Sequence, residues 1–148
     1  MPQSLSKIYL HLIFSTKCRQ PNIQSNIKAE LHAYMGGILN SLGCPVIIVG
    51  GMSDHVHLLF CMNRKKSVSD IVKELKANTT IWYKKRIGCN FAWQRGYAIF
   101  SVSQSQVENV LKYIENQEVH HKKQSFKEEY RAFLKGYKIN FDETYVWD

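Results

Sequence analysis

Two apolar segments separated by a short turn constrain the fold of this chain more than any other feature. The segments are residues 45–49 and 55–61, and the five residues between them read Gly-Gly-Met-Ser-Asp. A connection of this length is typical of a β-hairpin. The sequence therefore predicts two neighbouring antiparallel strands, around which the other elements must pack.

Hydrophobic periodicity predicts further strands and helices on both sides of the hairpin. Residues 7–16, rich in β-branched and aromatic side chains, predict a first strand, and residues 97–103 predict a fourth. Apolar residues recur at helical spacing over 23–42, which Gly43 ends, and a second helix is expected over 68–87. Two more helices are expected over 104–121 and, from a capping-box pattern, over 125–134.

The order of these elements indicates the fold class. A β-α-β-β-α-β order is that of the split β-α-β architecture, an α+β, ferredoxin-like or RRM-like fold with an antiparallel sheet. The additional helices follow at the C-terminal end. With 148 residues, the chain has the size of one compact domain, so residues 1–148 are expected to form a single unit.

Composition limits the class of protein. The net charge of +8, from 20 Lys and Arg against 12 Asp and Glu, favours a polyanionic partner, although many basic proteins have none. The four cysteines form no Cys-x-x-Cys pair, which argues against a zinc ribbon or a thioredoxin-type site. No apolar leader or membrane-length apolar run is found, so no membrane association is expected and we expect a soluble, cytoplasmic protein.

A His-x-His pattern lies inside the third predicted strand. Residues i and i+2 of a strand share a face, so His55 and His57 should project together, in a geometry that suits one metal ion. Val56, Leu58 and Phe60 would hold the opposite face in the core. In a chain with six histidines such a pair also arises by chance, so the pattern alone favours a structural role over a metal site.

Tyr113 and Gln117 lie four residues apart in the third predicted helix and should share one helical face. That face borders an apolar stripe, which places both side chains at the rim of the buried surface. A tyrosine at such a position is also an ordinary core aromatic. The combination with the histidine pair is what favours a functional site.

Three segments together resemble a known family. Residues 54–59 (DHVHLL) resemble the His-hydrophobic-His signature of the HUH endonucleases. Residues 93–97 (WQRGY) and 112–117 (KYIENQ) resemble the single-tyrosine transposases of small bacterial insertion sequences, the TnpA type. The similarity runs nearly end to end and includes residues 15–17 and the FKEEY segment at 126–130.

The resemblance implies a site and a substrate. Tyr113 would be the catalytic nucleophile, and His55, His57 and Gln117 would hold a divalent ion, usually Mg²⁺ or Mn²⁺. The expected partners are single-stranded DNA with a subterminal hairpin and a second copy of the chain. In such homodimers the tyrosine helix of one subunit lies against the histidine pair of the other, and we extend this arrangement to the present chain.

The chemistry of these residue types fits that activity. A tyrosine that attacks a phosphodiester forms a phosphotyrosine and frees a 3′-hydroxyl, so rejoining needs no nucleotide cofactor. A metal ion would polarise the phosphate. The reference pKa of tyrosine is about 10, so nearby positive charge should favour the phenolate, and the sequence identifies no general base. Two imidazoles and an amide suit Mn²⁺, Zn²⁺ or Fe²⁺ better than Mg²⁺.

For the other histidines and the basic residues, the sequence leaves two alternatives open in each case. His120 and His121 could ligate a metal or lie solvated at a helix end, and His11 could approach the site from the first strand or belong to the core. A basic stripe opposite the packed face of the second helix could track a DNA backbone or simply be solvated. The candidate DNA-binding residues are Lys73, Lys76, Lys84, Lys85, Arg86 and Arg95.

Three alternatives to a transposase remain open from the residues. An RNA-binding module is suggested by residues 95–98, which copy the first half of the RNP1 pattern, but Ile99 and Phe100 depart from it and the segment falls on the wrong strand. A zinc hydrolase would need a third ligand at a familiar spacing. Relaxases and replication initiators share the histidine signature, whereas the short chain and the single helix-borne tyrosine favour transposition.

Overall fold

An antiparallel sheet of four strands forms the centre of the protein, for which a computed structural model describes residues 2–148. The strands are β1 (Tyr9–Ser15), β2 (Val46–Gly51), β3 (His55–Cys61) and β4 (Ala98–Val102). Their order in the sheet is β2-β3-β1-β4, and every neighbouring pair is antiparallel. The predicted hairpin and the predicted fold class are therefore confirmed.

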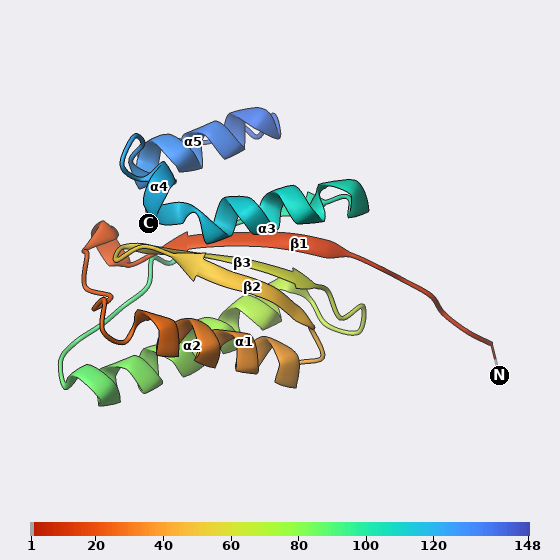
Figure 1. Ribbon diagram of the computed structural model, residues 1–148, viewed down its shortest axis with the longest axis horizontal. Helices are drawn as coiled ribbons and strands as arrows, with labels where there is room; N and C mark the ends of the chain where they lie inside the picture. The colour runs from red at the N-terminus through yellow and green to blue at the C-terminus, as the bar shows by residue number, and fades with distance from the viewer. Residues whose placement is uncertain (1) are drawn as a thin grey trace.

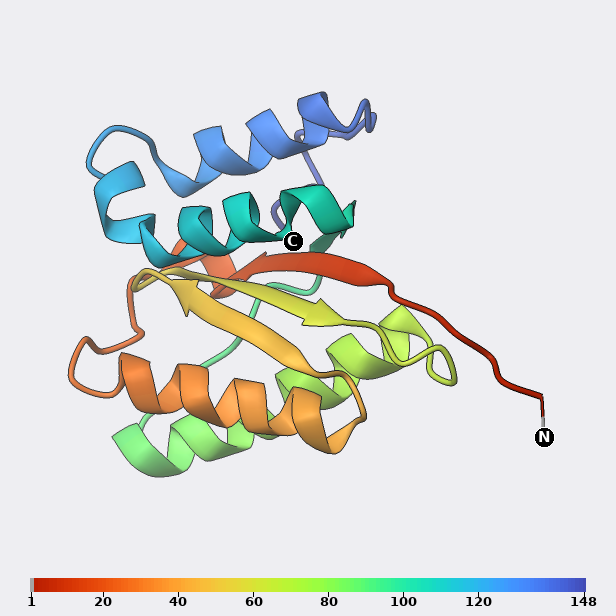
Figure 2. The ribbon, with the colours of Figure 1, turned by 45° about the vertical axis from the view of Figure 1, so that its right-hand side comes forward.

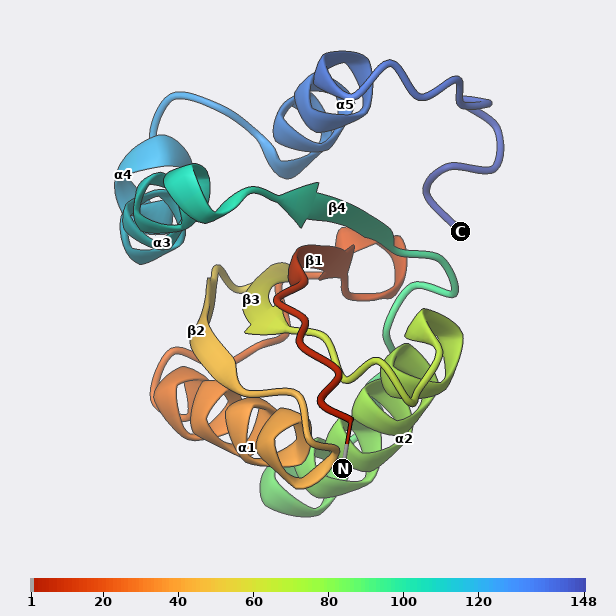
Figure 3. The ribbon, with the colours of Figure 1, turned by 90° about the vertical axis from the view of Figure 1, so that its right-hand side faces the viewer.

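Helices cover both faces of the sheet (Figure 1; Figure 3). One face carries α1 (Lys28–Ser41) and α2 (Val68–Ile87). The other carries α3 (Val107–Glu115), α4 (Gln117–His120) and α5 (Phe126–Gly136), and Figure 2 shows α5 lying above α3. Short 3-10 turns, η1 (Lys17–Arg19) and η2 (Gln104–Gln106), follow β1 and precede α3. No helix within residues 2–148 is both long and apolar enough to cross a membrane.

The alternation of side chains along β3 divides the protein into two packed layers. Val56, Leu58 and Phe60 are buried in the core that the sheet forms with α1 and α2. His55 and His57 point to the other face, under the C-terminal helices. The strand is therefore anchored by its apolar face, as its sequence predicts, and presents its two histidines to a separate layer.

The first helix is shorter than its apolar pattern predicts, because residues 23–27 pack without being helical. Ile23 and Ile27 are buried in the core, ahead of the first helical residue, Lys28. The hydroxyl of Tyr83 donates to the carbonyl of Asn22 and accepts from the backbone N–H of Gln24. These bonds satisfy backbone groups that a helix would otherwise satisfy.

The second helix has the predicted bounds, but its buried stripe differs by one residue. Ser67 caps its N-terminus, and Gly88, with φ of 69°, ends it in the left-handed conformation. The apolar spacing of the sequence predicts Trp82 on the buried stripe, but Tyr83 is buried instead, and Trp82 stacks on Tyr34 at the half-exposed edge between α1 and α2. The predicted continuous helix over 104–121 is also wrong, because Asn116 leaves helical geometry and separates α3 from α4.

Gly50 allows α3 to approach the edge strand β2 closely. A Cβ atom at this position would lie 2.7 Å from the Ile114 side chain and 2.9 Å from the Ile114 carbonyl oxygen. Both distances are shorter than a Cβ atom tolerates to an atom to which it is not bonded. The contact therefore requires glycine, and it fixes α3 against the sheet one residue away from Tyr113.

Candidate active site

His55 and His57 lie on a rigid central strand. Both side chains are fully buried, and their ring centroids are 5.2 Å apart. The Nδ1 atom of His55 lies 2.7 Å from an oxygen of Asp54, and Nδ1 of His57 lies 2.8 Å from Nε2 of His11. Each ring is oriented by these contacts, so both Nε2 atoms face the C-terminal helices.

Tyr113 and Gln117 meet the histidines from the helical layer. The Tyr113 ring is half-buried, and its centroid lies 5.9 Å from that of His57. Gln117 is buried rather than at the rim, because the break at Asn116 changes the direction of the chain. The Oε1 atom of Gln117 lies 2.9 Å from Nε2 of His55. The structure therefore brings together all four site residues expected from the sequence.

Glu129 on α5 joins these residues into one cluster, and the sequence did not assign it a role. Its Oε1 lies 2.9 Å from Nε2 of His57, while its Oε2 accepts hydrogen bonds from the Tyr113 hydroxyl and from Nε2 of Gln117. Oε2 also lies 3.3 Å from Nε2 of His121. The only sequence signal was the resemblance of residues 126–130, which singled out no residue.

Two acidic groups of this cluster differ in charge: Glu129 is a carboxylate, whereas Tyr113 is neutral. Burial raises the pKa of Glu129, but hydrogen bonds from His121 and His57 outweigh it and hold the pKa well below its usual range. Burial and the adjacent Glu129 carboxylate together raise the pKa of Tyr113 above its usual value. The tyrosine is therefore a neutral phenol beside a carboxylate, and among residues 2–148 no lysine contributes to this pKa.

The donor atoms of the cluster fit a metal ion. One ligand atom from each of His55, His57, His121 and Glu129 lies within 4.8 Å of the others. Burial lowers the pKa of His57 to about 4, which keeps this imidazole in the neutral form that binds metals. Three imidazoles and one carboxylate suit Mn²⁺, Fe²⁺ or Zn²⁺ better than Mg²⁺. His120 is outside the cluster and stacks on the Tyr113 ring, with 4.4 Å between centroids.

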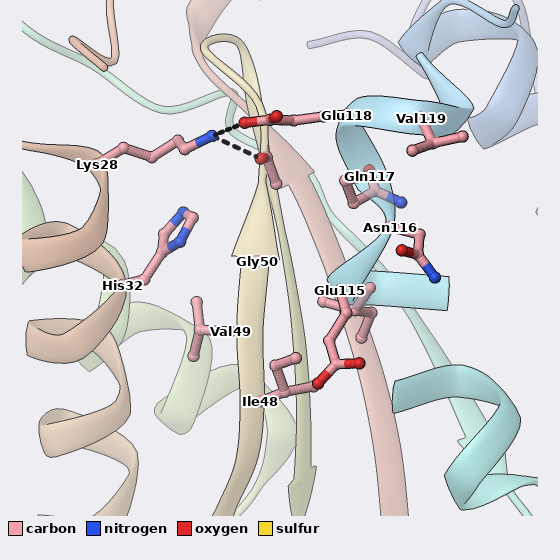
Figure 4. A pocket seen from close by; sticks show the side chains of 12 residues that line it. Lys28, His32, Ile48, Val49, Gly50, Glu115, Asn116, Gln117, Glu118 and Val119 are labelled. Carbon is pink, nitrogen blue, oxygen red and sulfur yellow. Dashed lines mark hydrogen bonds and ion pairs between the residues drawn. The ribbon is translucent and has the colours of Figure 1, made fainter. Parts of the chain in front are cut away.

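A cavity of about 290 Å³ lies behind Gln117, between α1 and the edge strand β2 (Figure 4). His32 projects into it from α1 and has no partner at Nε2. Lys28 bonds the Gly51 carbonyl and the Glu118 carboxylate across its upper end (Figure 4). His32 is thus a buried histidine near the cluster but not part of it.

All of the predicted basic residues except Lys76 are exposed. Lys73, Lys84, Lys85 and Arg95 are open to solvent. Arg86, although exposed, pairs with Glu30 on α1. Lys76 does not belong to an exposed stripe, because the loop after α2 folds over it and its Nζ donates to the carbonyls of Gln94, Arg95 and Gly96 at 2.8, 3.1 and 2.8 Å.

The difference in burial and hydrogen bonding predicts that Lys76 contributes much more to the free energy of unfolding than Lys73 does. Lys76→Ala should lower the free energy of unfolding by about 2 kcal/mol, because three carbonyls lose a charged donor. The matched change Lys73→Ala, at an exposed position of the same helix, should stay within about 0.5 kcal/mol of wild type. Urea denaturation measures both values, and equal midpoints would show that the Lys76 contacts add no stability.

The buried histidines predict a loss of stability in mild acid. His57 is neutral in the folded chain, whereas in the unfolded chain it takes up a proton near the ordinary histidine pKa of 6.5. The stability contributed by the neutral form is therefore complete above this pH and is lost as the pH falls toward about 4, by up to about 3 kcal/mol. Denaturation of metal-free protein between about pH 7 and pH 5 should show this slope. A His57→Gln variant should have a shallower slope, and an unchanged slope would contradict the assignment.

The described chain contains the nucleophile candidate and the histidines in one subunit. Tyr113 contacts Glu129 and lies beside His57 of the same chain. The expected exchange of the tyrosine helix between two subunits stays a prediction. The α3 helix is held in place by its own sheet, through contacts with β2 and β3.

The chain is similar to known transposases in sequence and in fold. Residues 4–117 match the model of a family described as IS200-like transposases. The ISDra2 transposase TnpA of Deinococcus radiodurans is 30% identical over 114 residues, which cover 72% of this chain and 81% of that protein.

Two solved structures share the fold. A protein described as a transposase of Deinococcus radiodurans superposes with a TM-score of 0.64 at 24% identity, covering 79% of this chain and 98% of that one. A REP-associated tyrosine transposase bound to a REP hairpin gives a TM-score of 0.61 at 12% identity, covering 82% and 73%. With more than half of its length matched by the family model, the chain belongs to the IS200-like transposases.

Proposed function

We propose that this transposase cleaves and rejoins single-stranded DNA at the ends of an insertion sequence, with Tyr113 as the nucleophile. The observation that carries the proposal is the position of Glu129. One of its oxygens accepts a hydrogen bond from the Tyr113 hydroxyl, and the other contacts His57 in the candidate metal cluster. A single buried carboxylate thus connects the reacting hydroxyl to the metal ligands.

The proposed reaction begins at the Tyr113 oxygen. This atom attacks the scissile phosphorus, a bond forms between them, and the bond to the 3′-oxygen breaks. The phenol proton passes to Glu129, which already accepts it in a hydrogen bond, and the leaving 3′-oxygen takes up a proton from solvent to become the 3′-hydroxyl. Attack by a 3′-hydroxyl on the phosphotyrosine reverses the bond changes and rejoins the strand.

A divalent ion fits this site through the donors of His55, His57, His121 and Glu129, with the Gln117 amide oxygen adjacent. Such an ion would supply Lewis-acid polarisation of the phosphate. His11 and Asp54 would keep the two histidine rings oriented from behind. Mn²⁺ is the ion we favour for the assay, because it accepts both nitrogen and oxygen ligands.

The substrate we propose is single-stranded DNA that carries a hairpin near the cleavage site. A related fold, the REP-associated tyrosine transposase, was solved with a DNA hairpin. The exposed residues Lys73, Lys84, Lys85 and Arg95 are suited to contact phosphates, and the net charge of +8 favours the association. Arg86 would have to release Glu30 before it could contribute.

The decisive experiment is the capture of a covalent protein–DNA adduct. Labelled single strands from the DNA that flanks the gene, incubated with purified protein and Mn²⁺, should give an adduct that survives denaturing electrophoresis. His57→Ala should lose Mn²⁺ affinity, measured by calorimetry, and adduct formation together. His32→Ala, which removes a histidine outside the cluster, should lose neither.

Two results would contradict the proposal. Failure of the wild-type protein to form an adduct with strands from either flank, with or without Mn²⁺, would reject the cleavage activity. Unchanged Mn²⁺ affinity in His57→Ala would reject the metal assignment while leaving Tyr113 as the nucleophile.

A further inference from the structure

A cavity of about 280 Å³ opens beside the Tyr113 hydroxyl, between α3 and α5. Its lining includes Tyr113, Glu129, Phe133, Gly136 and Tyr137. The volume is close to the lower limit for small-molecule pockets. All of these residues except Tyr113 lie beyond residue 117, where the match to the family model ends. The segment matched by the family model therefore contains only one of these lining residues.

Two aromatic rings that line the cavity, Phe133 and Tyr137, are held in place by a third ring, the buried Phe100. Tyr137 stacks on Phe100 of β4 with 4.4 Å between centroids, and Phe100 stacks on Phe133 with 5.5 Å between centroids. Phe133 in turn meets the edge of the Tyr113 ring, with centroids 5.7 Å apart. The Tyr137 hydroxyl donates to the carbonyl of Ser101, which fixes this ring although it is 47% exposed. The row of rings thus runs from solvent to the reacting hydroxyl.

The chemistry of the lining selects one kind of ligand. Glu129 is the only charged residue that lines the cavity in the described part of the chain, and its negative charge disfavours a phosphate or another anion. Flat apolar groups stack well on such rings, and base stacking on aromatic side chains is a general mode of single-strand binding. The group must also lie within one nucleotide of the phosphate that Tyr113 attacks, because Tyr113 itself lines the cavity.

We propose that this cavity binds the base of a nucleotide adjacent to the scissile phosphate, and so positions that phosphate at the Tyr113 oxygen. The inference rests on the proposed function, which it deepens by naming a substrate contact. Phe133 and Tyr137 provide the stacking surface, and the buried Phe100 supports both rings. A base bound in this way would hold the phosphate next to it at the edge of the cavity that Tyr113 forms.

Gly136 offers a way to fill the cavity without disturbing the fold. A Cβ atom at this position, the last residue of α5, meets no atom within 4 Å. Leucine is also a better helix former than glycine. Gly37 on α1 is an exposed helical glycine that likewise has nothing within 4 Å, so Gly37→Leu is the matched control.

The test combines these variants with abasic DNA. Single-turnover adduct formation is measured on an intact strand and on strands that lack the base at one or the other nucleotide flanking the cleaved phosphate. Wild type should lose roughly 5- to 150-fold in kcat/KM at one of the two positions, the loss expected for one stacked base. Gly136→Leu should lose a comparable factor on intact DNA and no longer distinguish the abasic strand, whereas Gly37→Leu should behave as wild type.

Each other outcome contradicts the inference. Equal wild-type rates on all three strands would overturn the base contact, and this comparison needs no variant. Retained discrimination in a folded Gly136→Leu protein, verified by thermal melting, would place the contact elsewhere while the proposed function stands. If wild type forms no adduct even with intact DNA, the proposed function fails, and the base-binding cavity fails with it.

Discussion

Tyr113→Phe should abolish strand cleavage while hairpin binding stays within about threefold of wild type. Removal of a covalent nucleophile has cost about 10⁶-fold in a well-studied hydrolase, so we expect a loss on the order of 10⁴-fold or more. The phenyl ring can keep its contacts with His57, His120 and Phe133. Glu129 keeps its other hydrogen-bond partners and is not left unsatisfied.

The measurement is denaturing electrophoresis of labelled single strands, with hairpin affinity from fluorescence anisotropy. Tyr145→Phe is the matched control, because Tyr145 is 67% exposed and makes no side-chain hydrogen bond among the described residues; it should cleave at the wild-type rate. Cleavage by Tyr113→Phe within tenfold of wild type would remove Tyr113 from its role.

A mixture of Tyr113→Phe and His57→Ala proteins should remain inactive. Each site in the described geometry uses Tyr113, Glu129 and His57 of one chain. Every site in the mixture then carries one lesion, whether the chains are monomers or exchange into dimers. We therefore expect cleavage no higher than the sum of the two separate proteins.

The shared-site arrangement makes the opposite forecast. If the tyrosine helix crosses to a partner, each heterodimer has one intact site, and cleavage returns with DNA attached to the His57→Ala chain. A size tag on one variant verifies that heterodimers form and identifies the chain that carries the adduct. Recovered activity on that chain would overturn the single-chain site and leave Tyr113 as the nucleophile.

The sequence predicted the histidine strand well because the pattern there is local. Val56, Leu58 and Phe60 occupy every second position of β3 and are buried in the core, and this alternation determines which face His55 and His57 occupy. The helix over 68–87 was equally predictable, since Ser67 and Gly88 cap it. Elements whose ends depend on distant partners were not, such as residues 23–27, which Tyr83 holds from 59 positions away.

The centre of the site was less predictable for the same reason. Glu129 and His121 reach the histidines only because the chain breaks at Asn116 and α5 returns over the sheet. No spacing rule connects Glu129 with His57, which lie 72 residues apart. Lys76 lies on the helical face that the spacing predicts. A loop formed by residues 94–96 covers it, however, and that loop follows the helix in the chain.

The close contact at Gly50 has a consequence for how the site tolerates change. Gly50 is the cross-strand partner of His57 in the sheet, and Ile114, against which it packs, is the next residue after Tyr113. Any side chain at position 50 would lift α3 from the sheet and move the nucleophile relative to the histidines. A displacement of about 1 Å can slow an enzyme by about 10²-fold. The absence of a side chain at position 50 therefore sets the distance between Tyr113 and the histidines.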